Sequence, residues 1–268
     1  LTQLATDAHV LVNAVNPTSY TRWAREWPPM SAAFLTAAAR TGAGLLTVSN
    51  LYGYGPQPGV LSESTPLAAT GTKGRVRAQM WEDALAAHRR GEVRTTEVRA
   101  SDYFGADSRR QMSFLNDFLL RPLAAGKVAR PPMGNLDAPH SWTYLPDISR
   151  LAAALADRVA DDAIWGRAWH VPTAPARSLR EVAGDLAALG LVDSPRVRLM
   201  PRSLMRLARV VPLIGELEET AYQFERPFVL DSQAAQRELG LAPTPWADAL
   251  TETWQGFAGT SGGGVIAA

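Results

Sequence analysis

The sequence predicts an α/β protein built on a doubly wound parallel sheet, with a smaller, mostly helical lobe beside it. Three short apolar runs, at residues 9–14, 45–49 and 93–100, alternate with two stretches of helical periodicity. Short connections between such elements favour right-handed crossovers and parallel strands. Ligands of these sheets bind outside the carboxyl ends of the strands, so we expect the functional residues directly after each run.

The first two helices follow from the spacing of their apolar residues and from their glycines. Residues 30–38 repeat apolar side chains at helical intervals, and either Gly42 or Gly44 can supply the positive φ that ends a helix. Residues 74–90 have the apolar spacing of a second amphipathic helix, which is expected to end at Gly91. Each helix therefore lies between two of the predicted strands.

The second half of the chain mixes helices with short strands. A helix over 108–120 is expected to stop before Pro122, and Asp147 is expected to N-cap the next helix. Residues 178–181 have the pattern of a capping box, and 202–211 read as a further helix. These elements predict the end of the sheet and the helical lobe.

Composition excludes several classes of protein. Lys and Arg total 27 against 26 Asp and Glu, so the formal net charge of +1 indicates no nucleic-acid partner. The absence of cysteine excludes disulfides and thiolate metal sites, and no His, Asp or Glu cluster has metal-ligand spacing. No apolar run reaches the roughly 20 residues that span a bilayer, so no membrane partner and a cytoplasmic location are expected.

Five stretches of the chain carry motifs, at residues 10–16, 48–56, 99–105, 144–147 and 237–243. Together they resemble the NAD(P)-dependent epimerase/dehydratase family, the extended short-chain dehydrogenase/reductases. Residues 10–16 are similar to the family's hydrophobic strand end beside the cofactor, and 48–56 to its serine pair followed by V-Y-G. Residues 99–105 resemble the strand end that faces nicotinamide and substrate. Residues 144–147 and 237–243 are similar to its V-x-D and R-x-E-L-G motifs. Their order and spacing agree over most of the chain.

The resemblance implies a Rossmann-like fold, bound NAD or NADP, and a small-molecule substrate; a homodimer is left open. It assigns 1–170 to a partial NAD(P)-binding domain, interleaved after about residue 106 with the substrate lobe, and 171–258 mainly to that lobe. The glycine-rich 259–268 is expected to be a flexible tail. The family's G-x-x-G-x-x-G loop is absent, so we expect the first βαβ units to precede Leu1.

The family's catalytic pair is also absent. In this family a catalytic tyrosine is normally followed, four residues later, by a lysine that lowers the pKa of the tyrosine. Here one register places Ala69 before Lys73, and the other places Lys73 before Arg77. Lys73 and Arg77 are therefore candidate cations for cofactor oxygens, with a solvated helix face as the alternative, and Lys73 is also a candidate catalytic group.

Other candidate catalytic residues lie at the strand ends. Ser49 and Asn50 occupy the serine-pair position, where Asn50 either orients a substrate oxygen or satisfies turn backbone. Tyr52, Tyr54 and Tyr103 can supply a substitute phenol, although such tyrosines often only pack. Of these three tyrosines, Tyr103 is the one that we expect to be catalytic.

The resemblance also indicates which residues contact the ligands. The expected cofactor contacts, besides the two cations, are Asn13, Ala14 and Val15. The expected substrate contacts are Tyr20, Trp23, Tyr54 and Asp102, with ordinary aromatic packing as the alternative for the first two. His140 is interpreted as a polar surface group rather than a catalyst.

The preferred function is an epimerase/dehydratase-like or dehydrogenase-like enzyme with a non-standard active site. It would act on a hydroxyl or carbonyl of a sugar nucleotide or an alicyclic substrate. The alternative is a non-catalytic NAD(P)-binding regulatory protein on the same fold, which the missing tyrosine and lysine pair favours. Fold alone does not separate the two.

Overall fold

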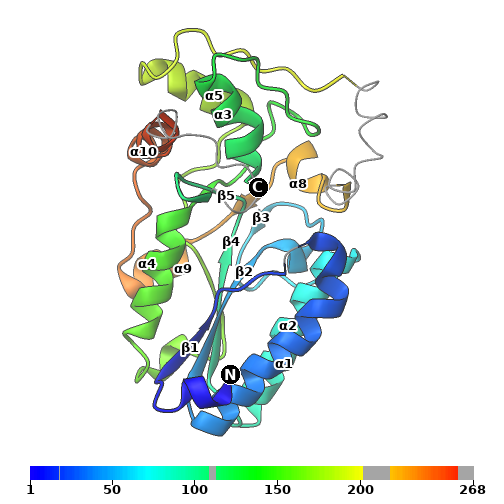
Figure 1. Ribbon diagram of the computed structural model, residues 1–268, viewed down its shortest axis with the longest axis vertical. Coiled ribbons are helices and arrows are strands. Elements are labelled where there is room, and N and C mark those ends of the chain that lie inside the picture. Colours follow the sequence, from blue (N-terminus) through cyan, green and yellow to red (C-terminus); the bar gives the residue numbers. More distant parts are fainter. Residues whose placement is uncertain (18, 109–112, 202–217, 259–268) are drawn as a thin grey trace, which may run out of the picture.

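A four-stranded parallel sheet forms the centre of the computed structural model, which describes residues 1–17, 19–108, 113–201 and 218–258. Its strands, in spatial order, are β1 (Val10–Asn13), β2 (Gly44–Asn50), β4 (Thr95–Ala100) and β7 (Ala168–His170). Every neighbouring pair is parallel, so the carboxyl ends of all four strands meet at one edge. Figure 1 shows the sheet in the lower half of the molecule, with the second lobe above that edge.

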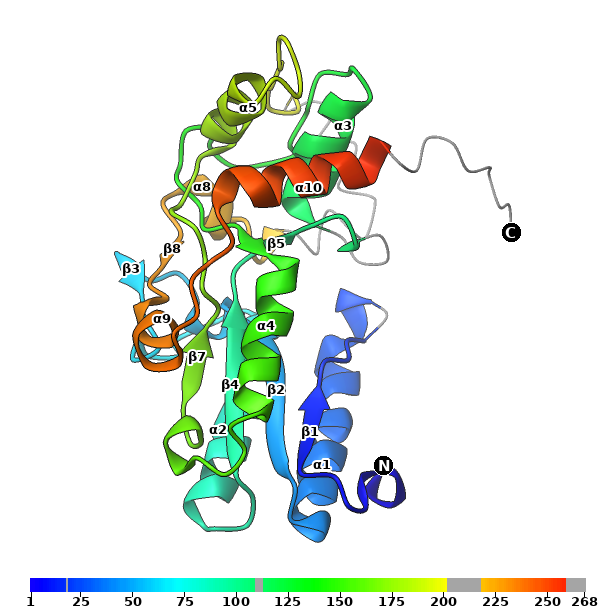
Figure 2. The ribbon, with the colours of Figure 1, turned by 90° about the vertical axis from the view of Figure 1, so that its left-hand side faces the viewer.

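Helices cover both faces of the sheet (Figures 1 and 2). One face carries α1 (Trp23–Thr41) and α2 (Thr72–Arg89), and the other carries α4 (Leu145–Ala156) and α9 (Gln233–Leu239). Apolar side chains alternate along β2 to meet both layers, since Leu45 packs with Ala38 of α1 and Leu46 with Leu151 of α4. The predicted doubly wound, Rossmann-like fold is confirmed.

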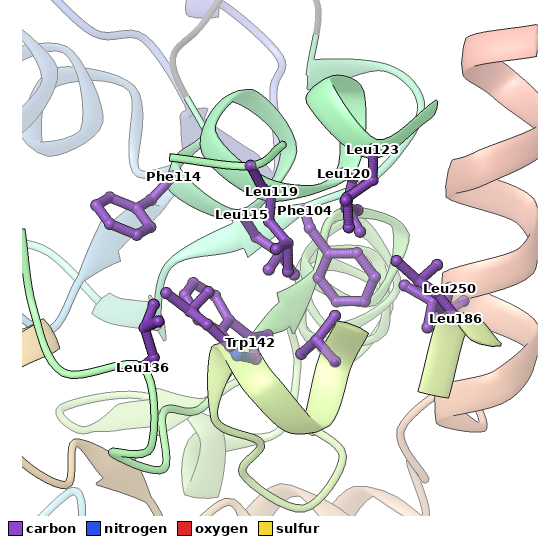
Figure 3. Close-up of a cluster of buried hydrophobic side chains, with 14 of the residues drawn as sticks. Phe104, Phe114, Leu115, Leu119, Leu120, Leu123, Leu136, Trp142, Leu186 and Leu250 are labelled. Atoms are coloured by element: carbon purple, nitrogen blue, oxygen red, sulfur yellow. The ribbon is translucent and has the colours of Figure 1, made fainter. Parts of the chain in front are cut away.

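The second lobe is mostly helical and has its own core, shown in Figure 3. Its helical segments are the π-helix η5 (Asn116–Leu120), α3 (Arg121–Ala124), α5 (Leu179–Ala188), α8 (Tyr222–Glu225) and α10 (Trp246–Ala258). Its core side chains include Phe104, Leu115, Trp142, Leu186 and Leu250. The predicted smaller lobe is therefore present.

Short elements connect the two parts. Two-residue parallel pairs join β3 (Val60–Leu61) to β8 (Val229–Leu230) and β5 (Tyr103–Phe104) to β6 (Thr143–Tyr144). The 3₁₀ turns are η1 (Thr2–Ala5), η2 (Tyr20–Arg22), η3 (Tyr52–Tyr54) and η6 (Asp162–Ile164). Within the described ranges, no helix combines the length and apolar character needed to cross a membrane.

The first helix begins earlier than its predicted apolar stripe. α1 starts at Trp23 and runs through Pro28 and Pro29, because the proline φ is compatible with a helix and buried Trp23 and Trp27 anchor its first turns. Gly42, with φ of 74°, ends the helix, while Gly44 begins β2. The choice that the sequence left open is thus settled in favour of Gly42.

Two predicted helix boundaries are wrong. The helix does not stop before Pro122, because the wider turns of η5 lead into α3, whose N-terminal turn contains this proline. Asp147 lies inside α4 and does not cap it, since its carboxylate is engaged by Thr244 and Arg150. The capping box of 178–181 is confirmed, whereas the predictions for 202–211 and 259–268 lie outside the described residues.

Candidate functional site

A cavity of about 890 Å³ opens at the carboxyl edge of the sheet. Its walls come from the ends of β1, β2 and β4, from the segment that enters α1, and from one side of α4. This volume lies within the range of small-molecule and cofactor sites. The position is the one expected for a ligand of a doubly wound sheet.

Most of the residues that the sequence singled out line this cavity. From the strand ends and the start of α1 come Ala14, Val15, Tyr20, Trp23, Ser49, Asn50, Asp102 and Tyr103, and α2 adds Arg77. These side chains lie far apart in the sequence and meet because parallel strands end at one edge. Other described lining residues, among them Ser101, Gln223 and Phe228, were not anticipated.

Three predicted site residues do not line the cavity. Asn13 is 1% exposed, and Tyr54 is fully buried under the sheet edge. Lys73 is 2% exposed, with Nζ 3.9 Å from Oε2 of Glu219 and 5.0 Å from the ring centre of Tyr20. All three residues are buried and lie outside the lining of the cavity, so we do not propose a direct ligand contact for any of them.

Arg77 is held between two indoles at the wall of the cavity. Its guanidinium carbon lies 4.8 Å from the ring centre of Trp23 and 4.3 Å from that of Trp27. Its Nε and Nη1 are buried without a hydrogen-bond partner. Burial lowers the pKa of Arg77 to about 10, so the group remains a cation at neutral pH. Among the described lining residues it is the only cation.

Two phenols of the cavity, those of Tyr52 and Tyr103, stay protonated at neutral pH. Burial raises the pKa of Tyr103, and the neighbouring Tyr20 and Asp102 raise it further. The pKa of Tyr52 is raised in the same way, first by burial and then by the same two neighbours. These phenols can donate a hydrogen bond to a ligand oxygen, but no base-like phenolate is prepared here.

Ser49 and Asn50 follow one another at the end of β2. Asn50 Oδ1 accepts a hydrogen bond from the backbone N of Tyr52 at 3.1 Å, as expected of a turn residue. Its amide nitrogen remains a donor, and both side chains line the cavity. The turn role is therefore present, and the ligand role stays a proposal.

Asp102 carries a partner that sequence reasoning missed. Its Oδ2 lies 3.0 Å from Nε2 of His140, which is 2% exposed instead of lying on the surface. The only signal in the sequence was the place of His140 at the head of an apolar strand rich in aromatics. In the part of the chain that the structure describes, no group of three or more His, Asp or Glu residues can hold a metal.

Comparison with known proteins identifies solved structures of the same fold. The sequence itself matches no protein-family model and no curated protein. The chain is similar to dTDP-glucose 4,6-dehydratase from Bacillus anthracis in complex with NAD, with a TM-score of 0.71 and 15% identity over 95% of this chain and 74% of that chain. UDP-glucuronic acid 4-epimerase from Bacillus cereus in complex with NAD gives a TM-score of 0.75 and 15% identity over 96% and 77%.

A third structure extends the likeness. It is dTDP-glucose 4,6-dehydratase from Streptomyces venezuelae with NAD bound, with a TM-score of 0.68 and 18% identity over 97% of this chain and 76% of that chain. At these identities the likeness establishes the fold. The site must therefore be argued from this chain's own residues.

Proposed function

We propose that the protein is an NAD(P)-dependent enzyme of the extended short-chain dehydrogenase/reductase type with a non-standard active site. The observation that carries the proposal is Arg77, a buried cation whose free N–H groups adjoin a cavity at the carboxyl edge of a Rossmann-like sheet. A buried N–H group that lacks a hydrogen-bond acceptor costs free energy, and binding an acceptor removes that cost. A dinucleotide offers ribose and phosphate oxygens that can do so.

The residues at this edge fit a nicotinamide dinucleotide. Val12 and Val15 at the end of β1 are 44% and 45% exposed, and both line the cavity, where they offer an apolar surface for an aromatic ring. Tyr20 and Trp23 add aromatic side chains to the lining, and the ring of Trp23 lies against Arg77. When bound, the dinucleotide supplies hydride transfer. The chain's own residues bind it, orient the reacting hydroxyl and exclude water.

The substrate that we propose is a sugar nucleotide or alicyclic compound with a hydroxyl or carbonyl at the reacting carbon. Ser49, Asn50 and Ser101 can bind its oxygens, and Tyr103 can donate to a carbonyl. The similar structures support this class, since they are those of dTDP-glucose 4,6-dehydratases and a UDP-glucuronic acid 4-epimerase with NAD. We propose that Lys73 positions Tyr20, whose ring it contacts, and that it does not touch the ligand itself.

Dinucleotide titration of Arg77→Gln tests the proposal. We expect NAD or NADP to bind the unaltered protein in isothermal titration calorimetry, and the variant to bind about tenfold to a hundredfold more weakly. A charge-assisted contact contributes about 1.5–3 kcal/mol. Arg77→Lys keeps the charge but loses the planar fork, so it should recover only part of the affinity.

Arg75→Gln is the matched control, because Arg75 is an exposed arginine two residues away on α2. It should leave dinucleotide affinity unchanged. Equal affinity in all variants, or no binding of either dinucleotide, contradicts the proposal. Tight binding without turnover of any sugar nucleotide or alicyclic alcohol favours the alternative, a non-catalytic NAD(P)-binding regulatory protein.

Three further features belong to the proposal. The division into a dinucleotide-binding part over 1–170 and a lobe mainly over 171–258 is the organisation that we propose for ligand and substrate binding. We also propose a cytoplasmic enzyme that forms a homodimer. Light scattering of the purified protein tests the assembly.

A further inference from the structure

Asp102 and His140 form a rigid pair at the wall of the cavity. Nε2 of His140 lies 3.0 Å from Oδ2 of Asp102, and the imidazole stacks on Phe224 and Phe228 with ring centres 5.0 and 5.4 Å away. The ring centre of Trp142, two residues further along the chain, lies 4.2 Å from that of the same imidazole. These aromatic contacts fix the orientation of the imidazole, and the imidazole in turn fixes the carboxylate.

Hydrogen-bond geometry determines where the protons of this pair lie. Nδ1 of His140 is 3.0 Å from the backbone oxygen of Gln223, and a carbonyl oxygen only accepts, so Nδ1 carries a proton. A proton must also lie between Nε2 and Oδ2, because two facing lone pairs would repel each other. One proton is therefore shared by Nε2 and Oδ2, and His140 occupies that side of the carboxylate.

The other carboxylate oxygen is left for the cavity. Among the described residues, the carboxylate of Asp102 is hydrogen-bonded only through Oδ2, to His140. Asp102 is also the only carboxylate among the described residues that line the cavity. The charge of Asp102 helps to raise the pKa values of Tyr52, Tyr103 and Tyr222, and burial is the chief cause of the rise in all three. Neutral phenols donate but do not take a proton, so Asp102 is the group suited to accept one.

We propose that Asp102 is the catalytic proton acceptor of this cavity, with His140 as its positioning residue. A substrate O–H bond breaks, the proton bonds to Oδ1 of Asp102 while the shared proton stays on Nε2 of His140, and the electron pair of the broken bond stays on the substrate oxygen. The reverse reaction returns the same proton to that oxygen. This role rests on the proposed function, whose dinucleotide supplies the accompanying hydride chemistry.

Asp102→Asn tests the proton acceptor. The amide keeps the shape of the carboxylate but cannot take a proton, so kcat for oxidation of a substrate alcohol should fall about a hundredfold to ten-thousandfold. Dinucleotide affinity should stay the same, and KM should change far less than kcat. Asp83→Asn, an exposed site on α2, is the control and should leave both constants unchanged.

His140 is tested by two variants and by a measurement on the ligand-free protein. His140→Gln retains an N–H for Asp102 and should keep a larger share of kcat than His140→Leu. The chain has four histidines, so nitrogen-15 NMR can assign the ring by its loss in either variant. The Nε2 shift should differ between the unaltered protein and Asp102→Asn, while Nδ1 stays protonated in both.

The outcomes separate this role from the proposed function. Dinucleotide binding by the unaltered protein tests the proposed function without involving Asp102. Binding without any turnover contradicts the proposed enzyme and the proton-acceptor role together, whereas turnover that survives in Asp102→Asn overturns the proton-acceptor role alone. An Nε2 shift that is the same in both proteins contradicts the shared proton.

Discussion

Tyr54 lies beneath the cavity, where its hydroxyl joins a group of buried polar side chains. It accepts a hydrogen bond from Nη1 of Arg99 at 2.8 Å and lies 2.7 Å from Nε2 of His170. Nδ1 of His170 is 2.7 Å from the backbone oxygen of Asp231, which only accepts. The imidazole is therefore protonated at Nδ1, and Tyr54 donates to Nε2. Burial raises the pKa of Tyr54 to about 12, in keeping with a donating phenol.

Tyr54→Phe should destabilise the protein by about 1–3 kcal/mol in urea unfolding. The substitution leaves Nη1 of Arg99 and Nε2 of His170 buried without their partner. Tyr222→Phe is the control and should cost less, because it loses a single bond of 3.3 Å from Gln223. Dinucleotide affinity should be unaffected by Tyr54→Phe, and a large loss of affinity would return Tyr54 to the ligand contacts.

His170 should make stability depend on pH. Burial lowers its pKa below the ordinary value of 6.5, so the unfolded state binds more protons wherever the pH lies below that value. The contribution of His170 is full above pH 6.5 and is lost as the pH falls through the lowered pKa of the folded state. A one-proton difference is at most about 1.4 kcal/mol per pH unit.

Urea titrations between pH 7.5 and 5 measure this slope. The free energy of unfolding of the unaltered protein should fall more steeply than that of His170→Gln. His9→Gln, at an exposed histidine, should keep the steep slope. Parallel curves for all three proteins would show that His170 does not titrate differently in the two states.

The sequence predicted which segments reach the site better than it predicted which side chains do. Ala14, Ser49 and Tyr103 line the cavity because parallel strands end together, which apolar runs reveal. Tyr54 does not, because the turn that follows β2 rotates its ring under the sheet edge. His140 was missed because its burial depends on contacts with residues more than 80 positions away.

At the scale of single elements, glycine positions decide where helices end. Gly42 has φ of 74°, and a side chain there would meet no atom within 4 Å, so only backbone strain opposes it. Gly184 lies in the interior of α5, also with open space around it. The same substitution should therefore act in opposite directions at the two sites.

Gly42→Ala should lower the free energy of unfolding by about 1–2 kcal/mol. Gly184→Ala should raise it by about 0.5–1 kcal/mol, because alanine loses less chain entropy in a helix. Urea unfolding of both variants in one buffer checks the pair. A shift of the same sign in both would mean that packing, not backbone conformation, governs these positions.

Element boundaries were the least predictable part of the helices. The spacing of residues 30–38 predicted α1 but not its start, because prolines usually mark helix ends and here lie within one. Pro122 is a similar case, because η5 continues directly into α3, which contains this proline in its first turn. Both exceptions depend on tertiary packing of aromatic or leucine side chains, which no local pattern contains.

At the scale of the whole molecule, Asp147 joins the sheet layer to the C-terminal lobe. It is 2% exposed on α4, and its carboxylate accepts from the backbone N and the hydroxyl of Thr244 at 2.9 and 2.6 Å. Thr244 lies two residues before the start of α10, which packs on the core of the lobe. The position of α10 over the lobe thus depends in part on one carboxylate 97 residues away.

Asp147→Asn should cost about 1.5–3 kcal/mol, because a charged acceptor of two hydrogen bonds is replaced by a neutral amide. Proteolysis at residues 241–245 should accelerate together with the loss of thermal stability. Asp157→Asn, exposed at the C-terminal end of the same helix, should leave both measurements unchanged. Lower stability without faster cleavage at this segment would place the role of Asp147 elsewhere.

The indole cage around Arg77 gives the molecule an optical property. Two of its eight tryptophans, Trp23 and Trp27, lie against a cation whose field changes when an anionic ligand reaches it. Intrinsic fluorescence should therefore respond to filling of the cavity without any attached dye. Trp23→Phe should weaken that fluorescence response. Trp165→Phe should leave the response intact, because Trp165 lies against Arg94 and not against Arg77. The emission spectrum would then report on the surroundings of Arg77 in particular.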